Sequence, residues 1–176
     1  MSQPPPNVLT ILPSTNASCI ILVAKPLKAL ADKGLIRLKT VLEKKASVSQ
    51  IGRADVIVFC RNTEPTYGNV LDTALALGKP IIFEHDPELA SYHRMPFRLQ
   101  QLEKYLVHAD LVRVYSPVML DLIRKFNSNA KLVKAGVDFR LLPKVVPRKR
   151  NDGIIHVVYA TSRIVDAQYQ LFLSAT

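Results

Sequence analysis

The sequence contains no tryptophan, and only 7% of its 176 residues are aromatic. Ile, Leu, Val and Ala must therefore supply most of a buried core. No apolar run approaches the ~18 residues that a membrane-spanning helix needs. The first residues, MSQPPPN, lack the basic stretch that opens a secretory signal. These absences indicate a soluble protein, which we expect to be cytoplasmic.

Cysteine is nearly as scarce as tryptophan. The chain has two, Cys19 and Cys60, which stand in the apolar segments CIILVA and VIVFC without the spacing of metal ligands. Two reduced, buried thiols are therefore expected. No paired-carboxylate motif for a metal is visible, so the sequence predicts neither a metal nor another cofactor.

Positive charge, in contrast, is abundant: 24 Lys and Arg stand against 14 Asp and Glu, a formal net charge of +10. This balance favours an anionic partner, which could be nucleic acid, an acidic membrane surface or a phosphate-bearing small molecule. The interpretation as a nucleic-acid binder would rest on charge alone, because no groove-reading motif is present. We therefore expect no nucleic-acid partner. The basic cluster Arg148 to Arg150 could meet anionic lipid and make the protein peripheral to the membrane.

Short apolar runs alternate with helical patterns in units of about 25 to 30 residues, which is typical of right-handed βαβ crossovers. The fold class predicted is α/β: a Rossmann-like parallel sheet of about six strands with helices on both faces. Strands are expected at 8–12, 35–42, 56–60, 81–84, 111–115 and 131–138, the second of them near an edge because apolar and basic residues alternate in it.

Helix boundaries are indicated by capping residues. Gly34 and Gly78 should end two helices, and Pro26 should break or restart the first of them. Asn69 is expected to cap the helix at 70–77, and Ser116 to cap a helix that Pro117 opens. Phe97 is expected on the apolar face of the helix that follows Pro96. Residues 17–24 could be helix or loop.

The composition changes near the C-terminal end. Residues 7–142 carry the alternating pattern of one domain, whereas 143–153 (PKVVPRKRNDG) have two prolines and a basic cluster, as a linker would. Residues 154–176 then begin a fresh buried strand and a helix-like tail. One strand and one helix cannot bury a core, so we expect a second domain that is truncated here.

Five segments, by their order and spacing, resemble the N-terminal domain of GT-B-fold glycosyltransferases of the group-1, polysaccharide-type family. They are PLKALADKG, RADVIVFCR, GKPIIFEHD, the pair HADLVRVYSPVMLDLIRKF and KLVKAGVD, and IIHVVYATSR, which resembles the start of the C-terminal, donor-binding domain. The resemblance covers nearly all of residues 7–176. The chain departs from the family at Ala135, where Asn is usual, and at Ala160-Thr161, where Gly-Ser is usual.

The resemblance implies an enzyme that transfers a sugar from a nucleotide-sugar donor to a saccharide or lipid-linked acceptor in polysaccharide biosynthesis. The donor would sit on the C-terminal domain, whose acidic motif lies further along than this chain reaches, and residues 7–142 would hold the acceptor. The chain by itself is therefore expected to be inactive. The donor, the acceptor, the stereochemical course and the oligomeric state stay open.

Ligands of open parallel sheets bind at the carboxyl ends of the strands, which places the candidate site residues. By the resemblance, His85 and Asp86 contact the acceptor or the transferred sugar and are the catalytic candidates; alternatively, Asp86 caps the turn before Pro87 and His85 is exposed. Arg61 ends a buried strand and could bind a phosphate or acidic group, or could form a structural ion pair with Glu84 or Asp86.

Three further cleft candidates follow the first strand. Ser14, Thr15 and Asn16 could offer free amides to an anion at a helix start, or could simply cap that helix. An alternative to the enzyme is a non-enzymatic, flavodoxin-like binding or regulatory domain with Asp86 as phosphoacceptor or ligand contact. A receiver domain needs an acidic pair after its first strand. This chain has PSTN there, which argues against a receiver domain.

Overall fold

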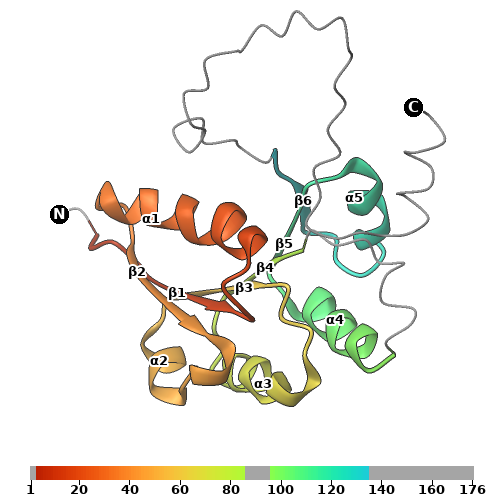
Figure 1. Cartoon of the computed structure of the whole chain (residues 1–176), viewed down its shortest axis with the longest axis horizontal. Coiled ribbons are helices and arrows are strands. Elements are labelled where there is room, and N and C mark those ends of the chain that lie inside the picture. The colour runs from red at the N-terminus through yellow and green to blue at the C-terminus, as the bar shows by residue number, and fades with distance from the viewer. Residues whose placement is uncertain (1–2, 86–95, 135–176) are drawn as a thin grey trace, which may run out of the picture. The chain divides into compact units, whose positions relative to one another are not determined.

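The structure is a computed structural model that describes residues 3–85 and 96–134, and these form one six-stranded sheet flanked by helices (Figure 1). All strand pairs are parallel, in the order β2-β1-β3-β4-β5-β6. The strands are β1 (Asn7–Leu12), β2 (Arg37–Leu42), β3 (Val56–Cys60), β4 (Ile81–Glu84), β5 (Leu111–Val114) and β6 (Ala130–Leu132). The predicted α/β fold is confirmed, and β2 lies at an edge as expected.

Helices connect consecutive strands and cover both faces of the sheet. In Figure 1, α1 lies on one face and α2 and α3 lie on the other. The π-helix η1 (Cys19–Ala24) runs directly into α1 (Lys25–Asp32). The remaining elements are the 3-10 helices η2 (Glu43–Lys45) and η3 (Pro65–Tyr67), and the α-helices α2 (Val48–Arg53), α3 (Gly68–Ala76), α4 (Pro96–His108) and α5 (Pro117–Ile123).

The core lies in two layers because residues of one strand alternate between the faces. Leu9 and Ile11 of β1 belong to the larger cluster, which includes side chains of α2, α3, α4 and α5. Val8 and Leu12 belong to the smaller cluster under η1 and α1, together with both cysteines. Cys19 and Cys60 are buried as predicted. Burial on both faces explains why the strands appear in the sequence as continuous apolar runs.

Several helix ends follow the sequence. Gly34 and Gly78 adopt the left-handed conformation, with φ of 70° and 59°, as expected of residues that end helices. Residues 19–24, which could have been loop, form the π-helix, and Pro26 lies in the first turn of the α-helix that restarts after it. Because η1 runs directly into α1, Pro26 lies within a continuous helical segment, and the change from π-helix to α-helix occurs next to the residue that lacks an N–H.

Two local expectations, on Asn69 and Phe97, are wrong, and a third, on Ser116, is confirmed in position but not in its side-chain bond. Helix α3 begins at Gly68, so Asn69 lies inside it instead of capping it. Ser116 takes the N-cap position of α5 but its side chain forms no cap hydrogen bond. Phe97 is 76% exposed instead of packed on the apolar face of α4.

The predicted linker at 143–153 and the start of a second domain at 154–176 lie outside the described residues, so the domain boundaries stay predictions. Within the described ranges, no helix combines the length and the apolar character needed to cross a bilayer.

Candidate functional site

A pocket of about 310 Å³ opens where the loops after β1, β2 and β3 meet. It lies at the carboxyl ends of the strands, and we call it the carboxyl-edge pocket. The chain passes from β1 to β2 on one side and then returns to β3 on the other side of β1. Such a switch point is where α/β sheets bind ligands. The lining residues are Pro13, Ser14, Asn16, Glu43, Arg61, Thr63, Glu64, Tyr67 and Arg98.

The loop after β1 contributes two of its three predicted cleft residues. Ser14 and Asn16 line the pocket, whereas Thr15 is exposed and is not among the lining residues. The side-chain oxygen of Asn16 accepts a hydrogen bond from the Cys19 amide at 2.9 Å, and its carbonyl accepts from the Ile20 amide at 3.1 Å. Asn16 therefore caps the helix that follows, as one of the two interpretations expected.

The loop after β3 is a tight turn that presents Arg61 to the pocket. Arg61 is half-buried and has a φ of 57°, a left-handed conformation that is costly for a residue with a side chain. Its amide donates to the Glu84 carbonyl at 3.0 Å. The next residue, Asn62, is fully buried, and its side-chain oxygen accepts from the Cys60 amide at 2.7 Å. These bonds hold the turn in place.

Of the two catalytic candidates, His85 is fully buried and is not among the residues that line the pocket. Its amide donates to the Arg113 carbonyl at 3.0 Å, and its ring stacks on Phe83 at 5.8 Å between centroids. The alternative that His85 is exposed is wrong, because the strands on both sides of β4 enclose it. Asp86 lies outside the described residues. A catalytic role for either residue remains a prediction.

Glu84, one predicted partner of Arg61, is 1% exposed and forms an ion pair with Arg113, whose Nε lies 3.2 Å from Oε2. The pair joins the carboxyl end of β4 to β5. A buried carboxylate needs such a partner, since an isolated charge in the interior is costly.

The sequence did not point to Glu43, which the structure places in the pocket wall. Glu43 follows β2 directly, yet its side chain turns inward and is 3% exposed. The Tyr105 hydroxyl donates to Oε1 at 3.4 Å. Burial raises the pKa of Glu43 to about 7, an effect that the neighbouring Asn62 and Tyr105 oppose and the charge of Glu64 reinforces.

The residues around Glu43 in the sequence do not indicate that its side chain is buried. It stands in the segment LEKK, which has the composition of a solvated turn. The rule that ligands meet the carboxyl ends of strands would have found it if the end of the strand at 35–42 had been included among the candidate positions.

The outer wall of the pocket is tied together by an ion pair. Arg98 of α4 reaches Glu64, in the loop before η3, with 2.7 Å between Nη2 and Oε2. The lining thus holds two carboxyl groups, Glu43 and Glu64, and two guanidinium groups, Arg61 and Arg98. A lining with balanced charge and both donors and acceptors suits a polar ligand without a large charge of its own.

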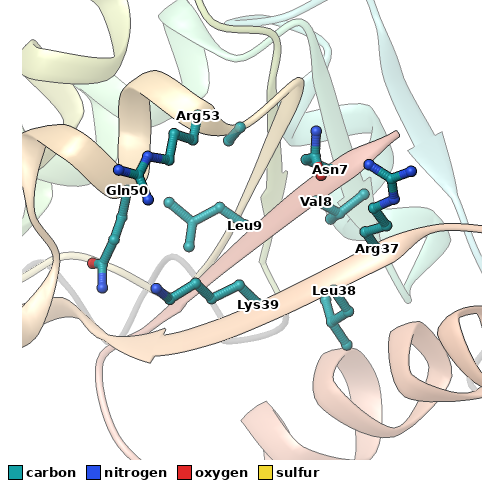
Figure 2. Close-up of a pocket in the computed structure, with 9 residues that line it drawn as sticks. Asn7, Val8, Leu9, Arg37, Leu38, Lys39, Gln50 and Arg53 are labelled. Carbon is teal, nitrogen blue, oxygen red and sulfur yellow. The ribbon is translucent and has the colours of Figure 1, made fainter. Parts of the chain in front are cut away.

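A second cavity, of about 250 Å³, lies at the other ends of β1 and β2 (Figure 2). Figure 2 shows Lys39 of β2 and Gln50 and Arg53 of α2 around Leu9. Arg37 also lines this cavity, and Arg37, Lys39 and Arg53 are exposed. It opens at the amino ends of the strands, away from the edge where parallel sheets bind ligands.

Metal ligands do not gather in the part of the chain that the structure describes. Among residues 3–85 and 96–134, no three His, Cys, Asp or Glu side chains lie together in a way that could hold a metal ion.

No family model and no curated protein sequence matches the chain. Two crystal structures of Anabaena Alr3699/HepE are similar to it. The complex with UDP-glucose matches 77% of this chain with a TM-score of 0.54 at 16% identity, and the complex with UDP matches 76% with a TM-score of 0.52 at 15% identity. The chain spans 45% of the length of each. This likeness confirms the fold, an α/β domain with a Rossmann-like parallel sheet.

Proposed function

We propose that this chain is the acceptor-side part of a glycosyltransferase, which moves a sugar from a nucleotide-sugar donor to a saccharide or lipid-linked acceptor. The observation that carries the proposal is the carboxyl-edge pocket, with its polar and charge-balanced lining at the switch point of the sheet. Its support is the shared fold with a protein solved in complex with UDP-glucose.

The lining suits sugar hydroxyl groups. Each hydroxyl both donates and accepts hydrogen bonds, and the pocket offers carboxyl groups as acceptors and guanidinium groups as donors. A nucleoside diphosphate fits less well, because its negative charge would meet Glu43 and Glu64, and Arg98 is already paired with Glu64. The pocket therefore favours the acceptor over the donor.

The donor belongs, by the resemblance, to the C-terminal domain. Sugar transfer requires the two substrates to be oriented together and the departing diphosphate to be stabilised. In this proposal, residues 7–142 would hold only the acceptor. We therefore propose that nucleotide-sugars bind this chain weakly and that it transfers nothing without a donor domain.

The test has two arms on the 176-residue chain. Amide NMR spectra recorded with methyl glycosides of glucose, galactose, mannose and N-acetylglucosamine should shift signals of the pocket residues for at least one sugar. Calorimetric titration with uridine- and guanosine-diphosphate sugars should show weak binding. Micromolar binding of a nucleotide-sugar, about −8 kcal/mol, would place the nucleotide site in this domain and overturn the acceptor-side assignment, as would the absence of any glycoside response.

One observation favours a second candidate, a flavodoxin-like binding domain. The strand order starts 2-1-3-4-5, which is the flavodoxin-like order, and such folds bind their ligand at the switch point between β1 and β3. The loop after β1, Pro13 to Asn16, has no acidic pair for a receiver domain. Titration with flavin mononucleotide separates the two: saturable binding at the carboxyl-edge pocket would favour this candidate.

A further inference from the structure

We propose that Glu43 is the residue that recognises a ligand hydroxyl group in the carboxyl-edge pocket, by accepting its hydrogen bond through Oε2. The inference rests on the proposed function, in which this pocket holds a saccharide. It adds a named specificity residue to a site whose other predicted members came from the loops after β1, β3 and β4.

The burial of Glu43 is unusual for a charged residue in a segment whose next two residues are exposed lysines. Its neighbours Lys44 and Lys45 are exposed, whereas Glu43 is 3% exposed. The short helix η2 fixes the backbone, with the Ala46 amide donating to the Glu43 carbonyl at 3.0 Å. Burying a carboxyl group is unfavourable unless other groups bond to it. A buried acid in a pocket wall is therefore more readily explained by ligand binding than by stability.

The carboxyl group retains acceptor capacity toward a ligand. Oε1 accepts from the Tyr105 hydroxyl, and the Asn62 side chain lies near enough to the carboxyl group to lower its pKa. Oε2 is buried and accepts no hydrogen bond of good geometry from the residues that the structure describes. A carboxylate can accept about four hydrogen bonds. Since Glu43 also lines the pocket, a hydroxyl group bound there can supply a further donor.

Aromatic packing holds Tyr105, and with it Glu43, in a fixed position. The Tyr105 ring stacks on Phe83 with centroids 4.8 Å apart and meets Phe59 edge-on at 5.0 Å. Gly68 lets α4 approach closely, because a Cβ at that position would lie 3.2 Å from the Gln101 side-chain oxygen. A preorganised acceptor binds with a smaller loss of side-chain entropy.

The charged groups around Glu43 favour a neutral hydroxyl over an ionic ligand. Glu64 would repel an anion, and Arg61 and Arg98 in the same wall would repel a cation. The other titratable groups of the wall and the support are Tyr67 and Tyr105, and burial raises the pKa of Tyr105, so its hydroxyl remains a donor at neutral pH. A hydroxyl group adds no charge and satisfies Oε2.

Protonation of Glu43 gives the inference a measurable signature. Its pKa of about 7 means that roughly half of the molecules carry the charge at neutral pH. A hydroxyl that donates to the carboxylate favours the ionised form, so ligand binding should lower this pKa and release a proton. Affinity for the glycoside should therefore rise about tenfold between about pH 6 and pH 8, following the ionised fraction.

The experiment is the NMR titration with the responding methyl glycoside, at both pH values, on the wild-type chain, Glu43→Gln and Glu64→Gln. We expect Glu43→Gln to bind about fivefold to tenfold more weakly at pH 8, because a charged acceptor is replaced by a neutral one, and to lose the pH dependence. Glu64→Gln should keep the pH dependence, with a midpoint slightly lower in pH, because the Glu64 charge contributes to the raised pKa of Glu43. Thermal melts show that each variant is folded.

The outcomes separate the two proposals. If a glycoside binds the wild-type chain but affinity is independent of pH, or Glu43→Gln binds equally well, the role of Glu43 is overturned and the acceptor-side function stands. If no glycoside binds the wild-type chain at either pH, the proposed function itself fails. A pH-dependent affinity that disappears in Glu43→Gln alone supports both.

Discussion

Glu43 and Tyr105, 62 residues apart in the sequence, meet through a hydrogen bond from the tyrosine hydroxyl to Oε1 at 3.4 Å, and both side chains are buried. The bond joins the segment after the edge strand β2 to helix α4. It crosses the larger core beneath the carboxyl-edge pocket, so that the pocket wall and the core share one polar contact. The stability of the domain should therefore respond to the ionisation of a pocket residue.

The pH dependence of stability should reveal Glu43. Its folded pKa of about 7 lies above the ordinary value of 4.5, so the folded state binds the proton more tightly than the unfolded state. This contribution is fully present below the unfolded pKa and is lost as the pH rises through about 7, by about 3 kcal/mol in all. Urea unfolding of the wild-type chain at several pH values between about 5 and 8 measures it.

The matched variant for that measurement is Glu43→Gln, a neutral isostere of the protonated acid. It should show a flatter stability curve and be more stable than the wild type at pH 8. Glu64→Gln, in the exposed part of the same wall, should keep the slope and move its midpoint slightly to lower pH, because the charge of Glu64 makes only the smallest contribution to the raised pKa of Glu43. Parallel curves for the wild type and Glu43→Gln would contradict a raised pKa of Glu43.

Removing the tyrosine hydroxyl should destabilise the charged form of Glu43. Burial holds the pKa of Tyr105 far above its usual value, so the hydroxyl remains a donor throughout the neutral range. Tyr105→Phe keeps the stacking on Phe83 but removes that donor, and should cost about 1 kcal/mol at pH 8 and less at pH 5. The comparison of denaturant midpoints at the two pH values checks it; an equal loss at both would indicate a packing effect only.

The backbone of Arg61 should report local strain. Arg61→Gly and Arg61→Ala both remove the guanidinium group, but only glycine adopts a φ of 57° without steric cost. We expect Arg61→Gly to be more stable than Arg61→Ala by about 1 kcal/mol, with both variants weakened in glycoside binding. Thermal unfolding of the pair is the measurement, and equal stability would mean that the turn relaxes.

Capping at the helix after β1 can be tested with three alanine variants. Asn16→Ala removes the bond to the Cys19 amide and should cost about 1 kcal/mol. Thr15→Ala is the neighbouring control and should be nearly neutral. Ser116→Ala should be nearly neutral too, because the Ser116 side chain forms no cap bond. A loss at Ser116 as large as that at Asn16 would contradict the geometry at α5.

Much of the fold was predictable because its signals are local. The apolar runs at 56–60 and 81–84 predicted β3 and β4, since a strand buried on both faces requires apolar residues throughout. Gly34 and Gly78 predicted helix ends because their left-handed conformation suits glycine. The site was predictable only in outline: Ser14, Asn16 and Arg61 line the pocket, and His85 is buried away from its lining.

The sequence by itself determined the alternation of strands and helices, the parallel pairing and the edge of the sheet where ligands would meet the chain. Backbone conformation and apolar periodicity depend on neighbours a few residues away, so they can be recognised in the chain. The tertiary structure alone decided that Glu43 turns inward while Lys44 and Lys45 stay in solvent. Its burial depends on Tyr105 and Asn62, which only the packing of α4 and β3 brings to the end of β2, and the free energy of a carboxyl group is set by the groups around it.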